Sequence, residues 1–308
     1  MSESLTYVLR IAVVLLAGAL IIGYLIGRDV LRQRRLRRLG GEPIPEEWLR
    51  ILEQNVPLYR RLPDDLKHEL HRQLKVFLTE RRLEGCGGLE ITDAIRVTIG
   101  AQACMLILGR KDGYRRTLAC VLVYPHHFVV PRRVPIGGGS HLVEPEERLG
   151  ESWRYGEVVL AWDEVKQGPE DRTDGRNVVL HEFAHQLDQE DGFSDGVPIL
   201  DRRSDYATWV RILGARYEEL RGTMEGADKG EGGAGGEVRA TGRTVLDPYG
   251  ASNPAEFFAV ATEAFFEKPG EVKRELPDLY EELRKYFRLD PADWSRLRRV
   301  RVAQPSRL

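Results

Sequence analysis

The chain has 308 residues, of which 46 are Lys or Arg and 48 are Asp or Glu, giving a formal net charge of −2. This length suffices for one large or two modest domains. The near-neutral charge argues against direct nucleic-acid binding, because nucleic-acid-binding domains are usually basic. The three cysteines, Cys86, Cys104 and Cys120, contain no C-x-x-C pair. They predict neither a disulfide framework nor a cysteine zinc site, and they fit a reducing compartment.

Residues 5–27 form the most apolar segment, and no charged residue lies between Ile11 and Ile26. About 20 such residues can span a bilayer as a helix. A cleaved signal peptide is the alternative interpretation. It would need a basic start and a small-residue cleavage site, whereas this chain starts with Met-Ser-Glu-Ser and the apolar segment ends in Gly27-Arg28. We therefore predict an uncleaved transmembrane helix.

Six arginines follow the apolar segment: Arg28, Arg32, Arg34, Arg35, Arg37 and Arg38. The positive-inside rule then places the N-terminus outside and the remainder in the cytoplasm. The arginines could instead form a solvated helix face or contact anionic lipid, and both alternatives keep them on the cytoplasmic side. The sequence thus predicts a single-pass protein of the cell inner membrane. Residues 1–40 would be the anchor with its basic flank, and residues 41–308 a cytoplasmic domain.

The domain is predicted to combine helices with a few strands. Helices are expected over residues 46–54, 64–80, 92–108, 177–191, 204–221, 254–267 and 277–287, and strands over residues 117–124 and 156–162. Residues 130–150 are expected to form a long surface loop that could include a hairpin. Residues 222–242 are rich in glycine and poor in large apolar side chains, which predicts a flexible insertion.

The motif His181-Glu182-Phe183-Ala184-His185 lies in the helix predicted over residues 177–191. Two histidines four residues apart project from one face of a helix and can share one Zn²⁺. Glu182 can then reach a water at the open position of the metal. The alternative is a solvated helix that matches this short motif by chance. The apolar residues 178–180 and the absence of Pro or Gly between Asn177 and Asp191 favour the metal site.

A tetrahedral site with an open position is most readily completed by a carboxylate from a separate element. Asp188 could hydrogen-bond the outer N–H of a ligand histidine, or it could cap the next turn with Asp191-Gly192. The helix at Pro254 offers two acids with apolar neighbours, Glu256 and Glu263. Glu256 could equally close a capping box with Asn253, three residues before it. The residues alone leave the choice between Glu256 and Glu263 open.

With these motifs in place, the chain from about Ile44 to Trp294 resembles the Mlc titration factor A (MtfA) family of zinc-dependent peptidases. The matching blocks are Gly88-Leu89-Glu90-Ile91-Thr92, Val123-Tyr124-Pro125, Val159-Leu160-Ala161-Trp162, His181 to Asp188, and Tyr249 to Phe266. The resemblance implies an α+β fold with a gluzincin-like core, in which helices pack on a small mixed sheet. The membrane anchor and the glycine-rich insertion depart from the familiar soluble members.

The resemblance also implies roles for individual residues. Glu256 matches the family's ligand position. Glu263 matches a following acid that would contact a ligand residue without touching the metal. Tyr249 corresponds to a family tyrosine, so we expect it to donate a hydrogen bond to the oxyanion, with packing at the helix entrance as the alternative. Glu182 is expected to act as the general base.

The function predicted from the sequence is therefore a zinc-dependent peptidase acting on a peptide or protein substrate, with the aminopeptidase-type activity that the resemblance implies. Residues 158–162 could pair with an extended peptide as an edge strand. The alternative is a regulatory binding protein, because some members of the family capture a transcriptional repressor. A purely structural zinc would have no need of Glu182 and would usually close its fourth position with Cys or His, which favours the enzyme.

Overall fold

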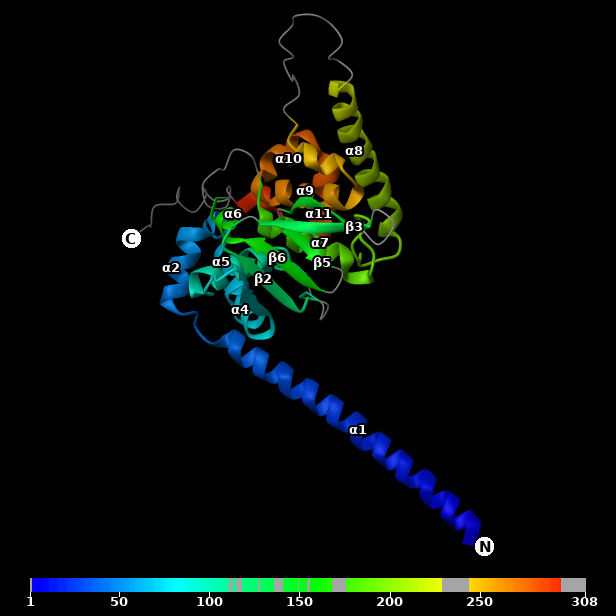
Figure 1. Cartoon of the computed structure of the whole chain (residues 1–308). Helices are drawn as coiled ribbons and strands as arrows, with labels where there is room; N and C mark the ends of the chain where they lie inside the picture. The colour runs from blue at the N-terminus through cyan, green and yellow to red at the C-terminus, as the bar shows by residue number, and fades with distance from the viewer. Residues whose placement is uncertain are drawn as a thin grey trace, which may run out of the picture. The chain divides into compact units, whose positions relative to one another are not determined.

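The computed structural model describes residues 2–110, 113–114, 118–126, 128–135, 141–148, 150–153, 156–167, 176–228 and 244–294. The chain divides into two compact units, Met1–Ile44 and Pro45–Leu308. Each unit is described by itself (Figure 1).

The first unit is one long helix, α1 (Ser2–Gly41). Large apolar side chains along it are exposed, among them Leu15, Leu16, Leu20, Ile21, Ile22 and Ile26. Within the part of the chain that the structure describes, no helix is both long enough and apolar enough to cross a membrane. The predicted anchor over residues 5–27 falls on this helix, and its side chains at positions 5, 6, 8, 9, 11–14 and 25 lie outside the described residues.

The second unit is mainly helical. Its helices are α2 (Glu46–Asn55), α3 (Pro57–Arg61), α4 (Asp64–Glu80), α5 (Asp93–Met105), α6 (Trp162–Gln167), α7 (Val178–Asp188), α8 (Asp205–Asp228), α9 (Pro254–Glu267), α10 (Pro269–Glu275) and α11 (Pro277–Phe287), with the short 3₁₀ turns η1 (Gln189–Asp191) and η2 (Pro248–Ala251). The bounds predicted for α4, α9 and α11 are confirmed. Each of these helices begins at a proline or directly after one. Proline lacks a backbone N–H and is tolerated in the first turn of a helix but not in its interior, so it marks the helix start.

A four-stranded mixed sheet lies beside these helices, in the order β1-β2-β6-β5. Its strands are β1 (Arg82–Gly85), β2 (Cys120–Tyr124), β6 (Glu157–Ala161) and β5 (Gly150–Trp153). The first three run parallel, and β5 pairs antiparallel with β6. Helices and strands together confirm the predicted α+β class.

The structure corrects the prediction of an edge strand at residues 158–162. Strand β6 has a hydrogen-bonded neighbour on both sides, β2 and β5, so no backbone edge is left for a peptide. Val158 and Leu160 are fully buried, as expected of an inner strand. The edge position next to β6 belongs to β5, a segment without the apolar alternation that predicts a strand.

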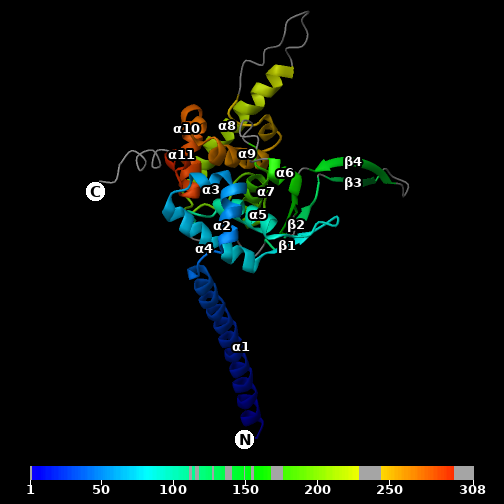
Figure 2. The same ribbon diagram turned by 90° about the vertical axis from the view of Figure 1, so that its left-hand side faces the viewer.

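A second, two-stranded sheet replaces most of the predicted loop between residues 130 and 150. Strands β3 (Phe128–Pro135) and β4 (His141–Arg148) pair antiparallel, with Pro131 opposite Pro145. Figure 2 shows this hairpin extending away from the helices of the domain. The hairpin mentioned as an option for this loop is therefore confirmed.

Helix α8 is longer than predicted. It continues to Asp228, seven residues beyond the expected end at Arg221. Arg221 forms ion pairs with Glu218 and Glu225 on the same helix, and the Thr223 hydroxyl donates to the Glu219 carbonyl. These local interactions extend the helix into the glycine-rich segment. The rest of the predicted insertion, residues 229–242, lies outside the described residues.

Helix α7 lies in the centre of the domain, packed against α9 on one side and against β5 and β6 on the other (Figure 1). Phe183 is fully buried and contacts the rings of Phe77 on α4 and Tyr114. Phe265 and Phe266 of α9 pack on Phe287 of α11. This packing fixes α7 and α9 side by side, and the candidate site lies between them.

Candidate metal centre

The entrance of α7 is fixed by Asn177, a residue that sequence analysis did not single out. Its side-chain oxygen accepts a hydrogen bond from the Leu180 N–H at 3.1 Å, which caps the helix. Its side-chain nitrogen donates to Gln102 of α5 at 2.8 Å and to Glu267 of α9 at 2.9 Å. A polar residue directly before an apolar helical segment is the signal that could have identified this cap. Asn177 thereby sets the position of α7 relative to both neighbouring helices.

The entrance of α9 follows the same pattern, with Asn253 as the cap and Pro254 in the first turn. The Asn253 side chain accepts from the Glu256 N–H at 3.0 Å. The Glu256 carboxylate does not complete a capping box, because it is directed at the two histidines of α7 instead. The backbone N–H of Glu256 donates to the cap Asn253, while the Glu256 side chain belongs to the site.

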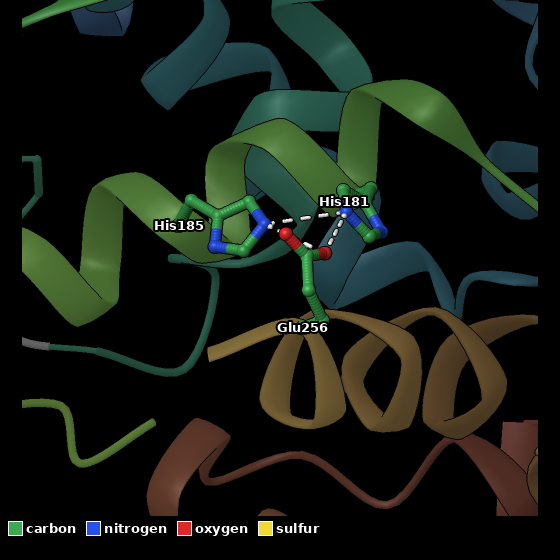
Figure 3. Close-up of side chains that lie close together, drawn as sticks. All are labelled: His181, His185 and Glu256. Atoms are coloured by element: carbon green, nitrogen blue, oxygen red, sulfur yellow. Dashed lines mark hydrogen bonds and ion pairs between the residues drawn. The ribbon is translucent and has the colours of Figure 1, made fainter. Parts of the chain in front are cut away.

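Three side chains converge between the two helices (Figure 3). Glu256 Oε2 lies 2.9 Å from His181 Nε2 and 3.3 Å from His185 Nε2, and the two Nε2 atoms are 3.2 Å apart. Their possible ligand atoms all lie within 4.8 Å of one another. In neutral imidazoles and an ionised carboxylate these atoms carry lone pairs, so three of them facing one point form a binding site for a cation.

Glu263, two turns further along α9, contacts His181 on the ring nitrogen that faces away from Glu256. Its Oε1 lies 2.7 Å from His181 Nδ1, and its Oε2 accepts the Asn177 N–H. A carboxylate beside Nδ1 keeps the proton on that nitrogen and leaves Nε2 directed at the cation position. The structure thus separates the two acids that the residues alone left undecided: Glu256 faces both histidines, and Glu263 faces the outer nitrogen of one.

The electrostatics of the pocket favour positive charge. Burial alone would lower the pKa of His181, but the carboxylates of Glu256 and Glu263 outweigh it and raise this pKa well above its usual value. Burial would raise the pKa of Glu256, yet its contacts with His181 and His185 lower it to about 2. The pocket therefore holds Glu256 as an ionised carboxylate and favours a positive charge on His181. A metal cation would compete with a proton for the histidine nitrogens.

Glu182 lies on the same helix turn and is almost fully buried, at 3% exposure. Burial raises its pKa to about 7, against the lowering influence of His181 and His185. Its buried Oε2 atom has no hydrogen-bond partner among the described residues. A buried carboxyl with a pKa near neutrality and one unused oxygen is suited to accept and return a proton.

Tyr249 lies on η2, immediately before α9. Its ring centroid is 6.0 Å from that of His181, and half of the side chain is exposed. Burial, with Glu256 and Glu182 nearby, raises the pKa of its hydroxyl. The hydroxyl therefore stays protonated at neutral pH and is able to donate a hydrogen bond beside the histidines.

Asp188, the other acid considered in sequence analysis, has a different environment. It is fully buried, and its Oδ2 accepts the Gly196 N–H at 3.0 Å. Gly196 has a φ of +76°, and a Cβ there would lie 2.4 Å from the carbonyl oxygen of Pro254. Asp188 thus ties the end of α7 to a loop that touches the first turn of α9. The structure shows this backbone contact for Asp188, and the proposed bond to a histidine stays a prediction.

Several known proteins are similar to this chain over most of its length. Residues 30–288 match the family model described as glucose-regulated metallo-peptidase M90. An uncharacterized protein of Synechocystis is 39% identical over 274 residues, which cover 88% of this chain and 94% of that protein. Mlc titration factor A of Pectobacterium atrosepticum is 31% identical over 80% of this chain and 87% of its own length. Mlc titration factor A of Klebsiella pneumoniae is 30% identical over 77% of this chain and 84% of its own length.

Proposed function

The chain belongs to the Mlc titration factor A family of glucose-regulated metallo-peptidases, M90, and we propose that it is a zinc-dependent peptidase whose metal is held by His181, His185 and Glu256. The observation that carries this proposal is the convergence of one carboxylate oxygen and two imidazole nitrogens between α7 and α9. Membership of the family supports the class of reaction, and the geometry of the three side chains supports the choice of ligands.

The donor set and its spacing fit zinc. Zinc binds imidazole nitrogen and carboxylate oxygen at about 2.0–2.2 Å, so two ligands of one tetrahedral ion lie roughly 3.3 Å apart. The three separations among Glu256 Oε2, His181 Nε2 and His185 Nε2 are 2.9, 3.2 and 3.3 Å. Three protein ligands leave the fourth position for water or substrate, which is the pattern of a catalytic site.

Zinc, when bound, would acidify a water and polarise the scissile carbonyl of the substrate. The chain's own groups perform the proton transfers. The Glu182 carboxylate accepts a proton from the attacking water and passes it to the leaving amine. The Tyr249 hydroxyl donates a hydrogen bond to the oxygen on which negative charge develops. Glu263 holds His181 in the tautomer that leaves Nε2 available.

The substrate class that follows is a peptide or protein, and we propose aminopeptidase-type activity in line with the family resemblance. The partner required is therefore the peptide itself.

Capture of a transcriptional repressor is the second candidate function. It is supported by the name of the relatives, Mlc titration factor A, and by the description of the family as glucose-regulated. Such binding need not use Glu182, so the two functions can be separated by one substitution.

We also propose that α1 attaches the protein to the cell inner membrane, with the catalytic domain in the cytoplasm. The exposed apolar side chains of α1, followed by six arginines, support this location. It is an addition to the peptidase proposal and does not affect it.

The substitution Glu182→Gln tests the peptidase proposal. It keeps the size of the side chain but removes the proton acceptor, so we expect zinc to be retained and hydrolysis to fall by at least about 10². The assay is turnover of peptides that the wild-type protein cleaves, found by digesting a peptide library, together with metal analysis of both proteins. Wild-type turnover by a zinc-loaded variant would remove Glu182 from the mechanism. Loss of hydrolysis with repressor binding intact would show that both functions exist and are independent.

A further inference from the structure

We propose that the ion pair between Arg176 and Asp247 positions Tyr249 beside His181, so that Arg176 and Asp247 are positioning residues for the reaction. This inference rests on the proposed function, because Tyr249 acts there as the donor to the oxyanion. Neither Arg176 nor Asp247 belongs to the motifs that identified the site. Both lie at the entrances of the elements that carry it.

The turn that carries Tyr249 is fixed by its own hydrogen bonds. Asp247 caps η2 and accepts the Tyr249 N–H through Oδ1 at 2.8 Å. The Ser252 hydroxyl donates to the Tyr249 carbonyl at 2.7 Å. Gly250 packs so closely that an added Cβ would lie 3.3 Å from Val260 of α9. Both backbone polar groups of Tyr249, the N–H and the carbonyl, are therefore held by hydrogen bonds.

The ring of Tyr249 lacks comparable support. Within the described part of the chain its hydroxyl has no hydrogen-bond partner, and half of the side chain is exposed. Its contact with the site is the tilted ring of His181 at a centroid distance of 6.0 Å. The placement of the hydroxyl thus depends on where the turn holds the backbone. A displacement of about 1 Å in a catalytic group can cost on the order of 10²-fold in rate.

The ion pair connects this turn to α7. Arg176 Nε donates to Asp247 Oδ2 at 2.6 Å, while the other oxygen of the same carboxylate accepts the Tyr249 N–H. Asn177, which follows Arg176 directly, is the buried cap of α7 and is bonded to α5 and α9. One carboxylate therefore joins the turn carrying Tyr249 to the start of the helix carrying His181. The sequence separation of 71 residues between the partners hides this connection from local patterns.

The charge of Asp247 is suited to this task. Burial would raise its pKa, but the hydrogen bonds from Arg176 and from the Tyr249 N–H outweigh burial and lower it. Asp247 therefore stays ionised at neutral pH. Its side chain is 18% exposed, whereas that of Arg176 is 65% exposed. Because the Arg176 side chain is largely exposed to water, the pair adds little to stability, so its substitution should alter placement more than folding.

The test is a double-mutant cycle on the full chain. Arg176→Gln should lower kcat about 10-fold with little change in KM, because binding is unaffected and only the donor moves. In the Tyr249→Phe background the same substitution should have no further effect. Arg176→Lys should restore part of the loss, since it keeps the charge. Arg221→Gln, which breaks the exposed pair with Glu218 on α8, is the matched control and should leave kcat unchanged.

Two outcomes would overturn the inference. One is an equal loss of kcat from Arg176→Gln with and without the Tyr249 hydroxyl. The other is a loss of zinc or of melting temperature that accounts for the lower rate, because the pair would then stabilise the domain and not the tyrosine.

A readout independent of turnover separates this inference from the peptidase proposal. With ¹³C-labelled tyrosine, the ring signal of Tyr249 is assigned by its absence in Tyr249→Phe. We expect that signal to shift or broaden in Arg176→Gln and to stay in place in Arg221→Gln. An unchanged signal in Arg176→Gln overturns the positioning role even if no peptide is cleaved. Failure of the wild-type protein to cleave any peptide contradicts the proposed function alone.

Discussion

Glu263→Gln tests the support that α9 gives to His181. The Glu263 carboxylate accepts two hydrogen bonds, one from His181 Nδ1–H at 2.7 Å and one from the Asn177 N–H. A glutamine at this position has only one acceptor oxygen, and its amide group is a donor. One of the two N–H groups therefore loses its partner in a pocket where the Glu263 side chain is 9% exposed.

The size of the effect follows from these contacts. An unpaired buried donor costs about 1–3 kcal/mol, and loss of a carboxylate behind a metal-ligating histidine typically weakens metal binding by about 10- to 100-fold. In free energy that factor is about 1.4–2.7 kcal/mol. We expect a zinc dissociation constant raised by this factor, whereas Glu256→Gln should weaken binding more, because it removes an atom that contacts the metal.

The assay is competitive titration of zinc against a chelator, with Glu267→Gln as the control. Glu267 lies on the same helix and accepts from the Asn177 side chain at 2.9 Å, a contact that one amide oxygen can still make. Its substitution should leave zinc affinity unchanged. Wild-type affinity in Glu263→Gln would refute the reasoning, and a larger loss in Glu263→Gln than in Glu256→Gln would assign the ligand role to Glu263.

Two further predictions concern pH and location. Burial lowers the pKa of His71 to about 4 from a usual 6.5, and its Nε2 lies 3.0 Å from the Tyr59 hydroxyl. Below pH 6.5 the unfolded chain binds a proton that the folded chain refuses until about pH 4, so the free energy of unfolding should fall across this window by about 1–2 kcal/mol after allowance for partial exposure. Urea titrations should show this fall in the wild type and not in His71→Gln, and equal slopes would contradict it. For α1, membranes should retain the full chain after a high-salt wash but not a chain lacking residues 1–40, and release by salt would contradict the anchor.

Several helices could be predicted because their ends depend on local chemistry. Pro254 begins α9 after the cap Asn253, and Thr92 caps α5 by accepting the Ile95 N–H. Caps and prolines act within three residues, so they are visible in the sequence. The motif from His181 to His185 is equally local, and the structure places both histidines on one face of α7.

The sheet could be predicted only in part, because pairing depends on distant segments. Strand β1 is four residues long, next to the glycines at positions 87 and 88, and its partner β2 begins 38 residues later. Strand β5 has no apolar alternation and is defined by pairing with β6. Without those partners neither segment carries a sufficient strand signal, and the prediction of β6 as an edge strand is wrong because β5 covers that edge.

The roles of the acids could not be derived from chemistry alone, for a similar reason. Glu256 and Glu263 are seven residues apart on one helix, and each is more than 70 residues from His181. Only the placement of α9 against α7 decides which carboxylate faces Nε2 and which faces Nδ1. Arg176 and Asp247 are similarly far apart in the sequence, so no local motif indicates their ion pair.

Zinc content tests the central claim most directly. Purified wild-type protein and the variants Glu182→Gln and Glu256→Gln are dialysed against metal-free buffer, and their metals are measured by mass spectrometry. The account predicts about one zinc per chain in the wild type and in Glu182→Gln, and little in Glu256→Gln, because three protein ligands define a catalytic zinc site. Full zinc content in a folded Glu256→Gln protein, or a folded wild type that binds no zinc when it is supplied, would contradict the account.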